Sequence, residues 1–172
     1  MLVRQITIRP QDIVALLKII SFAKAHSVWL RKDLAAALSL SNAEITNVFE
    51  RLRATGLIDI GRNVVHANAL YEFLIYGLKA TFPPAIGAET RGILTGSNAF
   101  EDNGMKSANY VWEHHEGKQR GFSLSPLYSE VVMASQKDKS LYLALCACDM
   151  LRVGRTREIN FARKWLKQFI ID

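Results

Sequence analysis

Residues 31–58 decide the fold, and their sequence is RKDLAAALSLSNAEITNVFERLRATGLI. Apolar residues recur at helical spacing in two runs, which predicts a short helix over residues 31–38 and a longer one over residues 42–55. Ser41 and Glu44 form the S-x-x-E pattern of a helix N-terminus. Gly56 stands where a left-handed residue commonly ends a helix. The stretch therefore predicts two helices joined by a tight turn.

The residues on either side extend this unit to residues 1–80. Pro10 is tolerated in a first helical turn, and the apolar spacing after it predicts a helix over residues 10–25. Two β-branched runs, residues 57–60 and 64–66, flank Gly61-Arg62-Asn63 and predict a tight hairpin with a basic tip. A fourth helix, capped by Asn68 and reaching about residue 80, is apolar over more than one stripe, so we expect a second surface to cover it.

This order of elements resembles the winged helix-turn-helix superfamily of bacterial transcription regulators, MarR-like in layout. The resemblance covers about residues 10–80 and rests on Leu34, Ala35, Leu38, Ser41, Ile45, Phe49, Leu52 and the run Gly56-Leu57-Ile58. It implies a domain with a two-stranded wing that binds double-stranded DNA. Residues 42–55 are then expected to enter the major groove, with the wing beside the flanking DNA.

The side chains of the predicted unit suit such a role. Small polar or methyl-bearing groups near the start of the helix over residues 42–55 can reach base edges, and cations elsewhere can reach phosphates. The carboxylates of Glu44 and Glu50 oppose this role, because they repel phosphates. We expect the Glu44 side chain to be engaged in the helix cap. We expect the DNA contacts to come from Arg31, Lys32, Ser41, Asn42, Ala43, Thr46, Asn47, Arg51, Arg53, Arg62 and Asn63.

The charge distribution favours a polyanionic partner. The net charge is +6, and residues 1–80 carry ten Lys and Arg against six Asp and Glu. Residues 81–130 are slightly acidic and residues 131–172 are basic. Neutralising phosphates releases counterions and is the main sequence-independent source of DNA affinity.

The rest of the chain differs from residues 1–80 in its composition and apolar spacing. Glycine and proline recur throughout residues 81–128, which predicts an irregular arm or linker with short strands near residues 110–112 and 121–124. Helical spacing returns over residues 129–172, where we expect a dimerisation or partner-binding region. The predicted fold class is mainly α within α+β.

The sequence favours no catalytic function. It lacks the phosphate-loop, zinc-protease and serine-hydrolase motifs, and His114-His115-Glu116 is more typical of a solvated turn. Cys146 and Cys148 lie in an apolar helical run and are expected to be inert core residues. We therefore expect no enzyme activity, cofactor or metal.

Two functional hypotheses remain. The first is a homodimeric DNA-binding regulator, located in the cytoplasm because the sequence shows neither a signal segment nor eighteen consecutive apolar residues. The second is an antitoxin-like or adaptor protein that binds a protein partner through residues 81–172. The two hypotheses are compatible.

Overall fold

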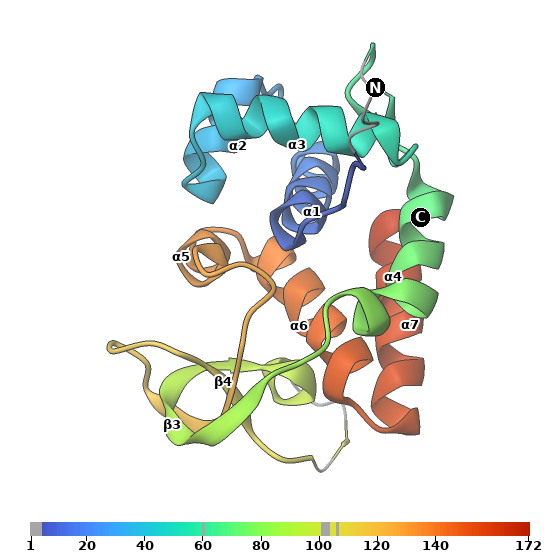
Figure 1. Cartoon of the computed structure of the whole chain (residues 1–172). Coiled ribbons are helices and arrows are strands. Elements are labelled where there is room, and N and C mark those ends of the chain that lie inside the picture. Colours follow the sequence, from blue (N-terminus) through green and yellow to red (C-terminus); the bar gives the residue numbers. More distant parts are fainter. Residues whose placement is uncertain (1–4, 60, 101–103, 106) are drawn as a thin grey trace.

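The computed structural model describes residues 5–59, 61–100, 104–105 and 107–172, and these form a mixed α+β fold with seven α-helices and two small sheets (Figure 1). The helices α1 to α3 lie at the top of the view, α4 to α7 form the middle, and a second sheet lies at the bottom. Within the described ranges, none of the helices combines the length and the apolar character needed to cross a membrane.

The first three helices follow the predicted boundaries closely. They are α1 (Pro10–Lys24), α2 (Arg31–Leu38) and α3 (Asn42–Ala54). The Ser41 hydroxyl caps α3 by accepting the backbone N–H of Glu44 at 3.0 Å. Gly56 has φ +71°, the left-handed conformation expected at the end of α3.

A two-stranded hairpin follows α3. The strands β1 (Ile58–Asp59) and β2 (Val64–Val65) pair antiparallel, and the turn between them contains Gly61, Arg62 and Asn63. Asn63 has φ +52°, a conformation that asparagine tolerates better than most residues. Ile60, the last residue of the predicted first strand, lies outside the described residues.

The remaining helices form the body of the molecule. They are α4 (Ala67–Thr81), α5 (Val131–Gln136), α6 (Lys139–Val153) and α7 (Thr156–Ile170). The α4 side chains Leu70, Leu74 and Leu78 are buried, and α4 packs against α6 and α7. The chain itself therefore covers the main apolar stripe of α4.

The prediction of an irregular arm over residues 81–128 is wrong. This region contains β3 (Ile86–Thr95), the 3-10 helix η1 (Gly96–Ala99), β4 (Tyr110–Glu113) and β5 (Gln119–Leu124). The first part of β3 pairs antiparallel with β5 and its last part with β4. A short parallel contact between β4 and β5 closes the sheet. The expected short strands at 110–112 and 121–124 lie within β4 and β5.

A buried ion pair attaches this sheet to the helices. On α6, Arg152 donates to Asp149 Oδ1 at 2.8 Å and to the carbonyl oxygens of Phe82 and Ser125. Asp149 Oδ2 accepts from Trp112 Nε1 of β4 at 2.8 Å. Because these partners satisfy the buried charges, α6 and the sheet are held in one arrangement.

One hydrophobic core runs through all three predicted regions. It includes α1 residues Ile13 and Leu16, the β4 residue Trp112, and Leu145 and Leu166 of α6 and α7. The segment 12–17 of α1 is buried without interruption. α1 contacts α2 and α3 as well as α6 and α7, so it is shared by the two ends of the molecule.

Candidate nucleic-acid interface

The candidate interface is the outward face of α3. The opposite side of the helix, which carries Ile45, Val48, Phe49 and Leu52, is buried against the rest of the chain. This 3.6-residue periodicity leaves the remaining side chains at the surface. We call the exposed residues from the N-cap to Arg53 the α3 outward face; they are Ser41, Asn42, Ala43, Thr46, Asn47, Glu50 and Arg53. In Figure 1 the helix lies along the upper edge of the molecule.

Local hydrogen bonds orient two polar side chains of this face. The Thr46 hydroxyl donates to the Asn42 carbonyl at 3.1 Å, which leaves its methyl group and an oxygen lone pair to face other atoms. Asn47 Nδ2 donates to Glu44 Oε2 at 3.3 Å. Both residues were predicted to contact bases, and both are exposed.

Arg51 lies elsewhere than the sequence suggested. Its side chain is 11% exposed and pairs with Asp12 of α1 and with Glu44, at 2.7 and 2.8 Å. Its charge is therefore already neutralised by two carboxylates, so a bound phosphate would have to compete with them. Sequence periodicity carries no signal for this contact, because Asp12 precedes Arg51 by 39 residues.

The expectation that the cap occupies Glu44 is also corrected. The Glu44 backbone N–H makes the cap bond, while the carboxylate accepts from Arg51, Asn47 and Gln11. The hydrogen bond from Arg51 lowers the pKa of Glu44 below its ordinary value and outweighs the opposing effect of burial. Hydrogen bonds from Arg51 to Asp12 and Glu44 in turn raise the arginine pKa. Glu44 and Arg51 therefore stay ionised.

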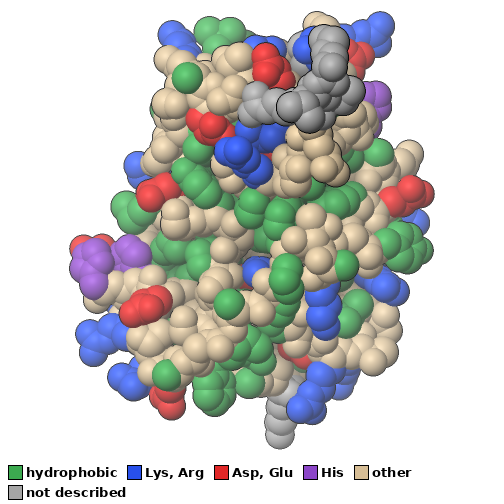
Figure 2. All heavy atoms as spheres, in the orientation of Figure 1, with side chains coloured by type: hydrophobic (Ala, Val, Ile, Leu, Met, Phe, Trp, Pro, Cys, Tyr) green, Lys and Arg blue, Asp and Glu red, His purple; other side chains and the backbone are tan. Residues whose placement is uncertain are grey.

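Four predicted cations remain exposed around the face. They are Arg31 and Lys32 at the start of α2, Arg53 near the end of α3, and Arg62 in the hairpin turn. The Arg31 guanidinium carbon lies 4.2 Å from the centre of the Phe49 ring, a cation–π contact that orients the side chain. Figure 2 shows Lys and Arg side chains at both upper corners of the molecule, over α2, α3 and the hairpin.

The hairpin turn also holds Asn63. Its Oδ1 atom is buried and has no hydrogen-bond partner among the described atoms. The neighbouring Arg62 backbone N–H donates to Asp59 Oδ1 at 3.3 Å, which ties the turn to β1. Arg62 is thus held by its backbone while its side chain remains exposed.

Part of the N-terminal segment lies beside α3, which its sequence did not indicate. Gln5, Ile6, Thr7 and Arg9 line a cleft of about 430 Å³ together with Asn47, Glu50 and Arg51 of α3. These residues precede the first helix and show no helical or strand periodicity. The contact between α1 and α3 places these residues beside the candidate interface.

Other candidate chemistry receives little support. Among the described residues, no group of three or more His, Cys, Asp or Glu side chains is arranged to hold a metal ion. His114 and His115 stack at 4.8 Å in the turn between β4 and β5. Cys146 and Cys148 are fully buried, as predicted, and burial raises the pKa of both thiols.

Comparisons with known proteins add no further candidate. The chain matches no known protein family, no curated protein and no solved structure.

Proposed function

We propose that this chain is a sequence-specific, double-stranded DNA-binding transcription regulator. In this proposal α3 enters the major groove and the β1–β2 hairpin lies against the flanking DNA, as in a winged helix-turn-helix domain. The observation that carries the proposal is the α3 outward face, whose seven residues between Ser41 and Arg53 are left exposed by the part of the chain that the structure describes. An α-helix with small polar side chains fits the width of the major groove.

The exposed cations support the same arrangement. Arg31 and Lys32 lie at the start of α2, Arg53 lies near the C-terminal end of α3, and Arg62 lies in the hairpin turn. In Figure 1 α2 and the hairpin lie toward opposite ends of α3. Phosphate contacts on both sides of a reading helix fix its register without adding sequence information. Asn42, Thr46 and Asn47 then supply the base contacts, since asparagine pairs with adenine through two hydrogen bonds.

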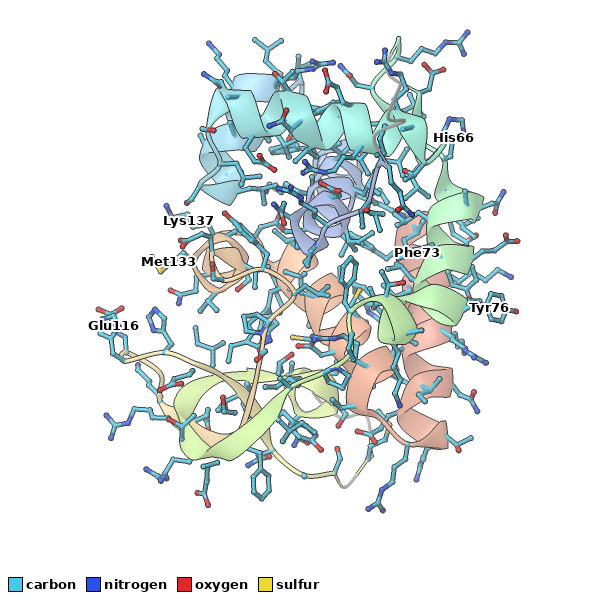
Figure 3. All side chains as sticks on the ribbon, in the orientation of Figure 1. His66, Phe73, Tyr76, Glu116, Met133 and Lys137 are labelled. Carbon is cyan, nitrogen blue, oxygen red and sulfur yellow. The ribbon has the colours of Figure 1, made fainter. Side chains whose placement is uncertain are left out.

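We further propose that the regulator is a homodimer. Two copies of α3 about 34 to 36 Å apart would meet successive major-groove faces of one DNA duplex. The outer side of α4 is the candidate contact, because it presents Tyr76, which is 78% exposed and projects from the helix in Figure 3. Sedimentation equilibrium at tens of micromolar tests this, and a monomer under all conditions contradicts it.

The experiment that tests DNA binding is site selection from a random duplex library with the full chain. We expect enrichment of a motif with two related half-sites. The triple variant Asn42→Ala, Thr46→Ala, Asn47→Ala should lose that enrichment while it still binds DNA weakly. If the wild-type chain enriches no motif, it is not a sequence-specific regulator.

A second candidate function is an adaptor that binds a protein through residues 81–172. The observation that favours it is a set of exposed apolar side chains in this region: Ile86, Phe122 and Met133 are 53%, 48% and 47% exposed. Figure 3 places Met133 of α5 and Lys137, which directly follows α5, on the side of the molecule away from α4, and Glu116 lies on that side too. This function would be favoured if the immobilised wild type retains a protein that Phe122→Ser does not retain, and if the wild type enriches no DNA motif.

A further inference from the structure

We infer that Glu44 determines base specificity, because its carboxylate fixes which end of the Asn47 amide is free to meet a base. This inference rests on the proposed function and deepens it. The sequence pattern predicted only a helix-capping role for Glu44 and gave no indication that it contacts Asn47. The structure shows that the Glu44 carboxylate instead touches three side chains.

The two oxygens of Glu44 have different partners. Oε1 accepts from Arg51 Nη2 at 2.8 Å and from Gln11 Nε2 at 3.3 Å. Oε2 accepts from Asn47 Nδ2 at 3.3 Å. Arg51 is itself held by Asp12, whose carboxylate is completely buried. Arg51 and Gln11 therefore fix the Glu44 carboxylate through Oε1, and Oε2 faces Asn47 on the α3 outward face.

This arrangement orients the Asn47 amide. A carboxylate only accepts hydrogen bonds, so it can hold the NH₂ end of Asn47 and cannot hold the carbonyl end. The amide oxygen and the second N–H then form the free edge. That edge carries the acceptor and donor that pair with adenine N6 and N7. Glu44 thus holds the Asn47 amide in the orientation that pairs with adenine even without DNA. Less side-chain entropy is then lost on binding.

Glu44→Gln should reverse the Asn47 amide rather than simply release it. Arg51 and Gln11 both donate, so they will hold the oxygen of the substituted glutamine side chain. The NH₂ group of that glutamine must then face Asn47, which can satisfy it only by turning its own oxygen inward. An N–H then faces the N6 position and the amide oxygen faces N7, so both hydrogen bonds with adenine are lost. Guanine keeps one contact, because its O6 accepts where adenine N6 donates, so the preference should move from adenine to guanine.

The test measures binding of the full chain to duplexes that differ at one base pair of its selected site. The base pair is identified as the one whose preference is lost in Asn47→Ala. There, we expect the wild type to prefer adenine over guanine about tenfold or more, as for a bidentate contact. Glu44→Gln should invert the order of the two bases, and Glu44→Ala, which frees the amide, should bring their affinities close together.

Glu113→Gln is the control, since it removes one negative charge from an exposed position of β4, outside the candidate interface. It should leave both the affinity and the base order unchanged. Circular dichroism and thermal unfolding establish that each variant is folded. A wild type that selects a site while Glu44→Gln keeps the adenine preference overturns this inference alone. A wild type without any base preference overturns the proposed function and this inference together.

Discussion

Arg51 of α3 holds Asp12 of α1 through two nitrogens, with Nε 2.8 Å from Oδ2 and Nη2 2.7 Å from Oδ1. Asp12 has no exposed surface, and its Oδ2 also accepts the backbone N–H of Arg9 at 2.8 Å. A planar guanidinium matches a carboxylate with this two-point geometry, which a lysine ammonium does not reproduce. The pair therefore fixes the first turn of α1 to the last turn of α3.

Arg51→Met should destabilise the fold by about 3 kcal/mol, because it keeps the aliphatic bulk but leaves the Asp12 carboxylate buried without its cation. Urea unfolding followed by circular dichroism measures the loss. Arg53→Met is the control: Arg53 is exposed on the same helix, and its replacement should change the free energy of unfolding by no more than about 0.5 kcal/mol. Similar small effects of both variants would contradict a structural role for the pair.

Stability should fall at acid pH through Asp138, the N-cap of α6. Burial raises the pKa of this carboxyl, but hydrogen bonds from Lys18, Ser21 and the Leu141 backbone outweigh burial and leave the pKa below its ordinary value. A carboxylate with a lowered folded pKa contributes stability above its unfolded pKa, about 3.9, and loses it as pH falls through the folded value.

Asp138→Asn tests this, since asparagine keeps the shape and the capping ability of aspartate. The variant should be less stable than the wild type at pH 7, and the difference should shrink as the pH falls below about 4. Thermal unfolding midpoints between pH 7 and pH 3 provide the measurement. A difference that is constant over this range would show that the charge of Asp138 does not stabilise the fold.

Arg62→Ala should weaken DNA binding by a similar factor for every sequence. Its side chain is exposed in the hairpin turn, where it is suited to a phosphate. Removal of one phosphate contact should reduce the slope of log affinity against log salt by about one unit. Anisotropy titrations at several salt concentrations measure the slope. Lys164→Ala, on the exposed side of α7, should leave it unchanged, and an equal slope for both variants would exclude Arg62 from the interface.

Gly92→Ala should destabilise the β3–β4–β5 sheet. A Cβ atom at residue 92 would collide with the carbonyl oxygen of Trp112 on β4, a backbone atom that cannot move independently. We expect a cost of about 3 kcal/mol, measured by urea unfolding. Gly87→Ala on the same strand is the control, because its Cβ would lie 3.4 Å from the Ser123 Cβ in ordinary contact. A cost for Gly92→Ala as small as that of the control would contradict the close backbone approach.

The N-terminal helices could be predicted from sequence because their signals are local. The apolar spacing and the Ser41 cap lie within the helices that they specify, and α2 has the boundaries that the sequence predicted. The sheet could not be predicted in the same way. Its glycines at 92, 117 and 121 resemble loop residues, yet each stands where another backbone comes too close for a Cβ atom. That requirement depends on strands that are distant in sequence.

In the candidate site, too, some features could be predicted from local sequence and others depend on tertiary contacts. The exposed positions of α3, including Asn42, Thr46 and Asn47, follow from helical periodicity. The partners of Arg51 and Glu44 do not, because Gln11 and Asp12 belong to another helix. From their charge, both arginines of α3 were predicted to contact phosphates. In the structure the Arg51 side chain is largely buried, whereas Arg53 is exposed.

The shared position of α1 has a mechanical consequence. Residues 12–17 have no face toward solvent, and the helix touches α3 on one side and α6 on the other. Because interiors are close-packed, a tilt of this enclosed helix would disturb its packing against both neighbours. Displacement of α6 would therefore remove packing from one face of α1, the helix against which α3 lies.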